Sequence, residues 1–208
     1  MASDPTSWTG LKASLANWLN RDDLNTIEIP EAIALAERRF QRTLIAPERE
    51  TAIDLVLDTE TVNLPGDLWG IKALHLDSDP RIVLEPMTLA ELRRTYSATA
   101  GGRPRHYAIS GETLVLGPPP DGAYPGRLTY VRTIPALGPD QESNWLLDDH
   151  PDLYLEGALA ELHTLLRDGE GAALFEGKCR QSIDEINHAS ARRLQGGAPI
   201  RIRARGVV

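Results

Sequence analysis

The sequence lacks the features of a secreted or membrane-spanning protein. It contains a single cysteine, Cys179, so it cannot form an internal disulfide. No positively charged start leads into an apolar run, as it does in a signal peptide, and no stretch approaches the roughly 20 apolar residues that span a membrane. We therefore expect a chain that is made in a cytosol and does not enter a membrane.

Basic residues are outnumbered by acidic ones. The chain has 22 Lys and Arg against 30 Asp and Glu, which gives a formal net charge of -8. Coating a protein in phosphate backbone requires clustered lysines and arginines, so the composition argues against bulk binding of nucleic acid. With 208 residues, 41% of them hydrophobic, the chain is long enough for one large or two small domains with a buried core.

The common signatures of enzymes are also missing. There is no Walker loop, no GxGxxG motif after a strand and no GxSxG elbow. Cys179 lies on an apolar helical stripe, where a thiolate is disfavoured, and is most simply a small core residue. We expect no enzyme activity and no cofactor, although carboxylates that only folding brings together are invisible at this level.

Apolar residues recur at helical spacing at both ends of the chain. Helices are expected over Leu11–Leu19 and from Pro30 to Leu44, because a proline at the first helical position costs no hydrogen bond. Two further apolar stripes, Leu155–Leu166 and Phe175–Ile186, predict a pair of antiparallel helices joined by a short connection.

The middle of the chain alternates apolar and polar residues, as strands do. Ile53–Leu57 is one such segment, and Tyr107–Leu116 predicts a hairpin with a tight turn at Gly111. Thr88 and Glu91 have the spacing of a capping box, which predicts a short helix between these strands.

Together these patterns predict an α+β protein. Its N- and C-terminal helices are expected to form a helical bundle with an inserted antiparallel β-sheet or small β-sandwich. The expected boundaries are 1–50 and 144–197 for the bundle, 51–143 for the β-rich region and 198–208 for a C-terminal arm.

Five acidic side chains and two histidines lie within residues 144–166, a segment that we call the acidic window. We interpret this crowding as the start of a helix. Asp148 or Asp149 is placed to accept hydrogen bonds from the free N–H groups of the first turn, and Pro151 suits that turn. Capping would account for most of the acidic side chains.

The two histidines of this window do not have the spacing of metal ligands. His150 and His163 are thirteen positions apart, about 20 Å along a helix, whereas metal-binding pairs on a helix stand at i and i+4. We expect no metal site here.

Two surfaces are candidates for protein contacts. Arg38, Arg39 and Arg42 lie on the charged face of the second expected helix, although such a face can simply be solvated. The other candidate is the C-terminal arm, which alternates apolar residues and arginines after the Gly196–Gly197 hinge and so resembles a strand. Its residues are Ile200, Arg201, Ile202, Arg203, Ala204 and Arg205.

The arm has two interpretations. In the first, the arm stays with its own subunit, where it pairs with the protein's own sheet or is solvated. Alternatively, it reaches past the hinge and adds a strand to a neighbouring protein, with its arginines against an acidic surface.

The order of several weak motifs between Ile29 and Ile186 resembles tailed-bacteriophage head-to-tail adaptor proteins, also called connector or head-completion proteins. The motifs are an LP-D turn, a P-x-x-Y-x-I-x-G-x-x-L hairpin, a Y-x-R strand, a W-L-L segment and a helix that begins H-P-D-L-Y-L. Here they are Leu64, Pro65 and Asp67; Pro104, Tyr107, Ile109, Gly111 and Leu114; Tyr130 and Arg132; Trp145–Leu147; and His150–Leu155.

The resemblance implies a virion structural protein at the head-tail interface. Such proteins form a homo-oligomeric ring, usually of twelve copies, that joins the portal protein to the tail or neck protein and leaves a channel through which DNA passes without sequence-specific binding. The resemblance also implies that the arm binds the portal. Two alternatives stay open: a tail-completion or neck protein one layer further from the capsid, and an enzyme that binds a divalent cation through the acidic window.

Overall fold

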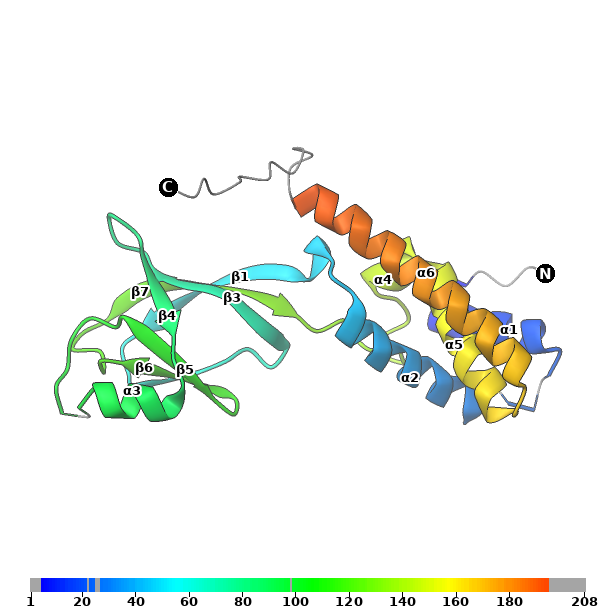
Figure 1. Cartoon of the computed structure of the whole chain (residues 1–208), viewed down its shortest axis with the longest axis horizontal. Helices are drawn as coiled ribbons and strands as arrows, with labels where there is room; N and C mark the ends of the chain where they lie inside the picture. The colour runs from blue at the N-terminus through cyan, green and yellow to red at the C-terminus, as the bar shows by residue number, and fades with distance from the viewer. Residues whose placement is uncertain (1–4, 22, 25–26, 98, 195–208) are drawn as a thin grey trace, which may run out of the picture. The chain divides into compact units, whose positions relative to one another are not determined.

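The computed structural model describes residues 5–21, 23–24, 27–97 and 99–194 (Figure 1). These residues form two compact units. A helical unit combines the described residues of Met1–Glu48 and Ile134–Val208, and a strand-rich unit consists of Arg49–Thr133. The chain therefore crosses between the units twice, once in each direction.

The helices of the helical unit begin and end at residues with clear local causes. The Ser7 side chain accepts a hydrogen bond from the Gly10 N–H at the start of α1, and Asn20 ends that helix in the left-handed conformation. Pro151 is at the first position of α5, as expected. The helices are α1 (Trp8–Leu19), α2 (Glu28–Thr43), α4 (Trp145–Asp149), α5 (Pro151–Leu165) and α6 (Gly169–Leu194).

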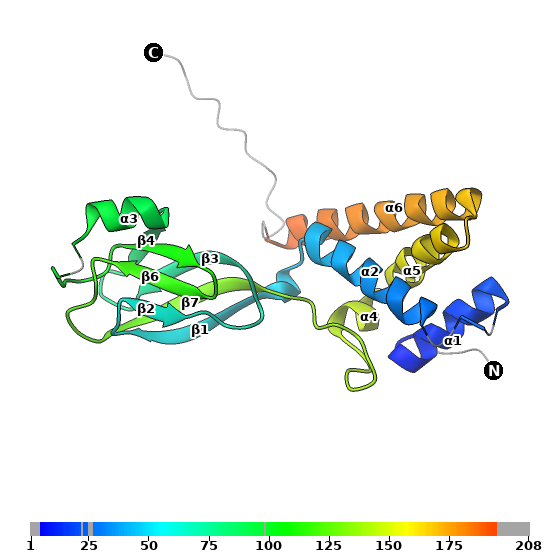
Figure 2. The same cartoon turned by 90° about the horizontal axis from the view of Figure 1, so that it is seen from below.

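α5 lies at the centre of this unit, and α1, α2, α4 and α6 pack against it. The Phe40 ring of α2 meets Tyr154 of α5 edge to face, with ring centroids 5.3 Å apart. Phe40 also lies over Gly157, where a β-carbon would come within 2.7 Å of the ring. The expected pairing of the two C-terminal helices is confirmed, since α6 follows α5 after a short turn and packs along it (Figure 2).

The strand-rich unit contains one seven-stranded sheet that curls into a half-barrel (Figure 2). Its strand order is β1-β7-β3-β4-β5-β6-β2. Leucines and tyrosines from six of the strands, β2 excepted, fill its buried core. The strands are β1 (Glu50–Leu57), β2 (Thr61–Asn63), β3 (Leu68–Leu76), β4 (Ile82–Pro86), β5 (His106–Ser110), β6 (Thr113–Gly117) and β7 (Tyr124–Arg132).

Two local predictions in this unit are confirmed. β5 and β6 form an antiparallel hairpin whose turn contains Gly111 with a positive φ of 61°, a conformation that suits glycine. Thr88 and Glu91 form a reciprocal capping box at the start of α3 (Leu89–Thr95), and the buried Leu92 packs this helix against β5 and β6.

The expected fold class is wrong. The described residues form six α-helices and a single curled sheet of mixed direction, not a bundle of N- and C-terminal helices with an inserted antiparallel sheet or small sandwich. The helices surround a central α5, and β4 and β5 run parallel. Parallel neighbours need a crossover connection, which α3 supplies. Alternating residues reveal that a strand exists but not its direction.

None of the helices in the described residues combines the length and the apolar composition that crossing a bilayer demands.

Candidate functional site

A helix begins in the acidic window, as expected, but the residue that caps it is a different one. Asn144 precedes α4, and its Oδ1 accepts a hydrogen bond from the Leu147 N–H at 2.9 Å. Asp148 instead accepts a hydrogen bond from the Ser143 hydroxyl. The prediction that Asp148 or Asp149 is the cap is therefore wrong. Two helices occur here: α4 is capped by Asn144, and α5 has no side-chain cap.

Asn144 also joins a buried hydrogen-bond network that sequence patterns did not reveal. Its Nδ2 donates to the Pro135 carbonyl at 2.7 Å and to the Tyr154 hydroxyl at 2.8 Å. The Tyr154 hydroxyl in turn donates to Oε1 of Glu37 at 3.1 Å, and the same oxygen accepts from the Leu137 N–H at 2.8 Å. The network therefore attaches the segment that returns from the strand-rich unit to α2 and α5.

Burial dominates the electrostatics of this network. It raises the pKa of Glu37, although the hydrogen bonds from Leu137 and Tyr154 partly oppose that effect. Burial also raises the pKa of Tyr154, and the neighbouring Glu37 charge raises it further. Tyr154 therefore acts as a neutral donor, and the network joins elements of the fold without offering an ionised nucleophile.

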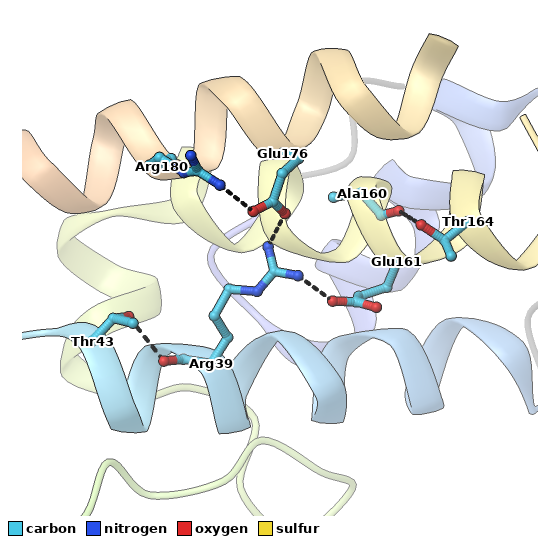
Figure 3. Close-up of polar contacts among 7 residues, drawn as sticks. All are labelled: Arg39, Thr43, Ala160, Glu161, Thr164, Glu176 and Arg180. Atoms are coloured by element: carbon cyan, nitrogen blue, oxygen red, sulfur yellow. Dashed lines mark hydrogen bonds and ion pairs between the residues drawn. The ribbon is translucent and has the colours of Figure 1, made fainter. Parts of the chain in front are cut away.

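The three arginines proposed as an interface have different environments. Arg39 points toward α5 and α6, where its Nη2 lies 2.6 Å from Glu161 Oε1 and its Nη1 bonds Glu176 (Figure 3). Its side chain is only 25% exposed. Arg38 and Arg42 are exposed. Arg39 thus links three helices of its own subunit, whereas the other two arginines remain accessible.

A second polar contact joins the end of α2 to α6. Asn187 Nδ2 donates to the Thr43 carbonyl at 3.0 Å, and its Oδ1 accepts from the Ile45 N–H at 2.7 Å. A groove of about 490 Å³ lies between this contact and Arg39, and Glu176 and Arg180 also line it. The groove wall therefore carries both signs of charge.

The two histidines of the acidic window have different environments. His163 Nδ1 lies 2.9 Å from Asp168 Oδ2, and its ring stacks on Phe175 with centroids 5.2 Å apart. His150 lies at the junction of α4 and α5. Within the described ranges, no three His, Cys, Asp or Glu side chains are grouped so that they could hold a metal ion.

The prediction that Cys179 is a core residue is confirmed. Its side chain is completely buried in α6, and burial raises its thiol pKa to about 11. The residue is therefore a thiol at physiological pH and contributes packing. The arm residues Ile200–Arg205 lie outside the described residues.

The described surface exposes several large hydrophobic side chains, among them Trp18, Trp69 and Val83. The model of the SU10 adaptor protein family matches residues 6–203, and the chain belongs to this family of phage adaptor proteins. The family resemblance inferred from the sequence motifs is thereby confirmed. A structural adaptor family is not a family of enzymes. No curated protein matches the chain.

Proposed function

We propose that the chain is the subunit of a head-tail adaptor ring in the virion. Twelve copies form the ring, which joins the portal to the tail and leaves an axial channel for DNA. The family match over residues 6–203 is the observation that carries this proposal. The net charge of -8 per subunit supports it, because acidic side chains facing a channel repel phosphates and let DNA pass without sticking.

A closed ring uses two different patches on each subunit, since neighbours meet head to tail. Arg38 and Arg42 on α2 are candidates for one patch because both are exposed. The second patch includes Trp18, whose side chain is 61% exposed although its ring packs edge-on to Phe175 at 6.1 Å. An exposed tryptophan is a typical anchor of a protein interface. Arg39 stabilises its own subunit instead.

Electron microscopy of the purified protein, alone and mixed with portal protein, tests this function. We expect rings that stack on the portal. The variant Arg38→Glu/Arg42→Glu should fold like the wild type but assemble poorly, whereas a single charge reversal elsewhere, Glu112→Lys in the β5–β6 turn, should assemble normally. Particles that remain single subunits with portal present would argue against the ring.

The two rival functions have separate tests. A neck protein one layer further from the capsid would bind a tail protein and leave the portal unoccupied in the same micrographs. A cation-binding enzyme would give stoichiometric heats with Mg²⁺, Mn²⁺ or Zn²⁺ in calorimetry. For an adaptor we expect binding to the portal and no stoichiometric heat.

A further inference from the structure

β1 is an edge strand of the half-barrel. It is the first strand in the sheet order, and among the described strands it pairs only with β7. All eight residues of Glu50–Leu57 pair with β7 in unbroken register. A long and regular edge presents a row of backbone groups that another extended chain can pair with.

The two faces of β1 differ in chemistry. Ile53 and Leu55 point toward the core of the sheet and are only partly buried. Ala52, Asp54 and Val56 alternate with them and are exposed. A strand added beside β1 would therefore have two faces. Its side chains on one face would cover Ile53 and Leu55, and those on the other face would lie beside the exposed residues of β1.

Acidic side chains lie along this edge, and two of them already pair with basic side chains of β3 and β7. Residues 50–60 contain four acidic side chains and no Lys or Arg. Glu50 bonds Lys72, and Asp54 bonds Arg127 across the sheet, yet the Asp54 side chain remains 70% exposed. Asp58 and Glu60, which follow β1, are exposed as well.

The arm of this same chain has the complementary pattern. Residues 195–208 contain three arginines and no acidic residue, and the arginines at 201, 203 and 205 alternate with Ile200, Ile202 and Ala204. If these six residues pair along β1, the arginines fall on the face of Asp54 while the isoleucines cover Ile53 and Leu55. The alternation of basic and apolar residues in the arm then matches the alternation of exposed and core-facing residues in β1.

We propose that residues 200–205 of one copy add a strand to β1 of a neighbouring copy, so that the arms link the ring subunit to subunit. This inference rests on the proposed ring and gives the arm a partner inside it rather than on the portal. Because every copy carries both the arm and the edge, the contact repeats around a closed ring.

Cross-linking between two full-length variants tests the pairing. One variant carries Ala52→Cys on the exposed face of β1, and the other carries Arg205→Cys in the arm, with different affinity tags. A short bismaleimide should join the two variants when they are mixed under the conditions that form rings. The matched control, Ser110→Cys on the interior strand β5, should give no such product, and the buried Cys179 should stay unmodified.

The charge pattern has its own test. Adding Asp58→Lys to the Ala52→Cys variant should lower the yield of the mixed product roughly fivefold, the upper range for one cross-strand charge pair. Adding Glu112→Lys, which makes the same change of charge elsewhere in the strand-rich unit, should leave the yield unchanged.

Two results would overturn the inference while leaving the adaptor function intact. They are rings in the micrographs without a mixed product, and an arm that cross-links to portal protein instead of to Ala52→Cys. Absence of rings together with absence of the product would instead refute the proposed function itself.

Discussion

The Tyr154 hydroxyl donates a hydrogen bond to Glu37 across the interface of α5 and α2, at 3.1 Å. The two residues are 117 positions apart in the chain. Because the same Glu37 oxygen accepts from Leu137, this carboxylate positions both the central helix and the segment that returns from the strand-rich unit. Its ionisation therefore bears on the stability of the whole helical unit.

We expect Glu37→Gln to change how stability depends on pH. Burial raises the Glu37 pKa, so the folded state holds this proton more tightly than the unfolded state does. The resulting stabilisation is fully present below the unfolded pKa and is lost as pH rises through the folded pKa. Glutamine keeps an acceptor oxygen and does not ionise, so the variant should gain on the wild type as pH rises. Urea unfolding from acid to neutral pH measures this difference, and a difference that stays constant with pH would contradict the expectation.

Two glycines in helices should respond oppositely to alanine. At Gly157 a β-carbon would meet Phe40 at 2.7 Å and Ala36 at 3.1 Å, so Gly157→Ala should lower the free energy of unfolding by about 1–3 kcal/mol. At Gly177 of α6 no atom lies within 4 Å of the added carbon. Gly177→Ala should therefore raise stability by about 1 kcal/mol through helix propensity. Equal effects in thermal unfolding would contradict the close contact of α2 with α5.

Asn144→Ala should destabilise the protein more than Asp149→Ala does. The first change removes a helix cap and two donated hydrogen bonds, one buried and one partly buried, at a cost of about 2 kcal/mol. Asp149 is exposed, so its replacement should cost less than about 0.5 kcal/mol. Denaturant unfolding of the two variants compares them directly, and the reverse order would restore Asp149 as the cap.

Arg39 and Arg42 should differ in how much they contribute to the stability of the fold. Arg39→Met breaks both ion pairs and leaves Glu161 and Glu176 without their shared cation, so unfolding should become easier by about 1 kcal/mol. Arg42→Met removes an exposed side chain and should change stability by less than about 0.5 kcal/mol. Calorimetric melting temperatures supply the comparison. A larger loss for Arg42→Met would mean that Arg39 does not link the helices.

The sequence predicted features whose cause lies within a few residues. The capping box of Thr88 and Glu91 and the Gly111 turn involve neighbours along the chain, and the apolar stripe that buries Cys179 has the period of one helix. The family motifs were equally readable, because each is a short run of local turn and strand chemistry.

The sequence could not reveal partners that are distant along the chain. Arg39 lies 122 positions from Glu161 and 137 from Glu176, and on a charged helical face an arginine that links helices is indistinguishable from a solvated one. The cap at Asn144 was missed for a related reason. Aspartate and asparagine cap equally well, so only the break between α4 and α5 decides which residue is used.

The sequence by itself thus determined the local elements and the adaptor family, because hydrophobic period and turn residues act over short stretches of chain. Only the tertiary structure decided that β5 runs parallel to β4, that α5 is central to the helical unit and that β1 ends the sheet. Those outcomes depend on which surfaces pack together, and a period of two or of 3.6 residues carries no record of the partner.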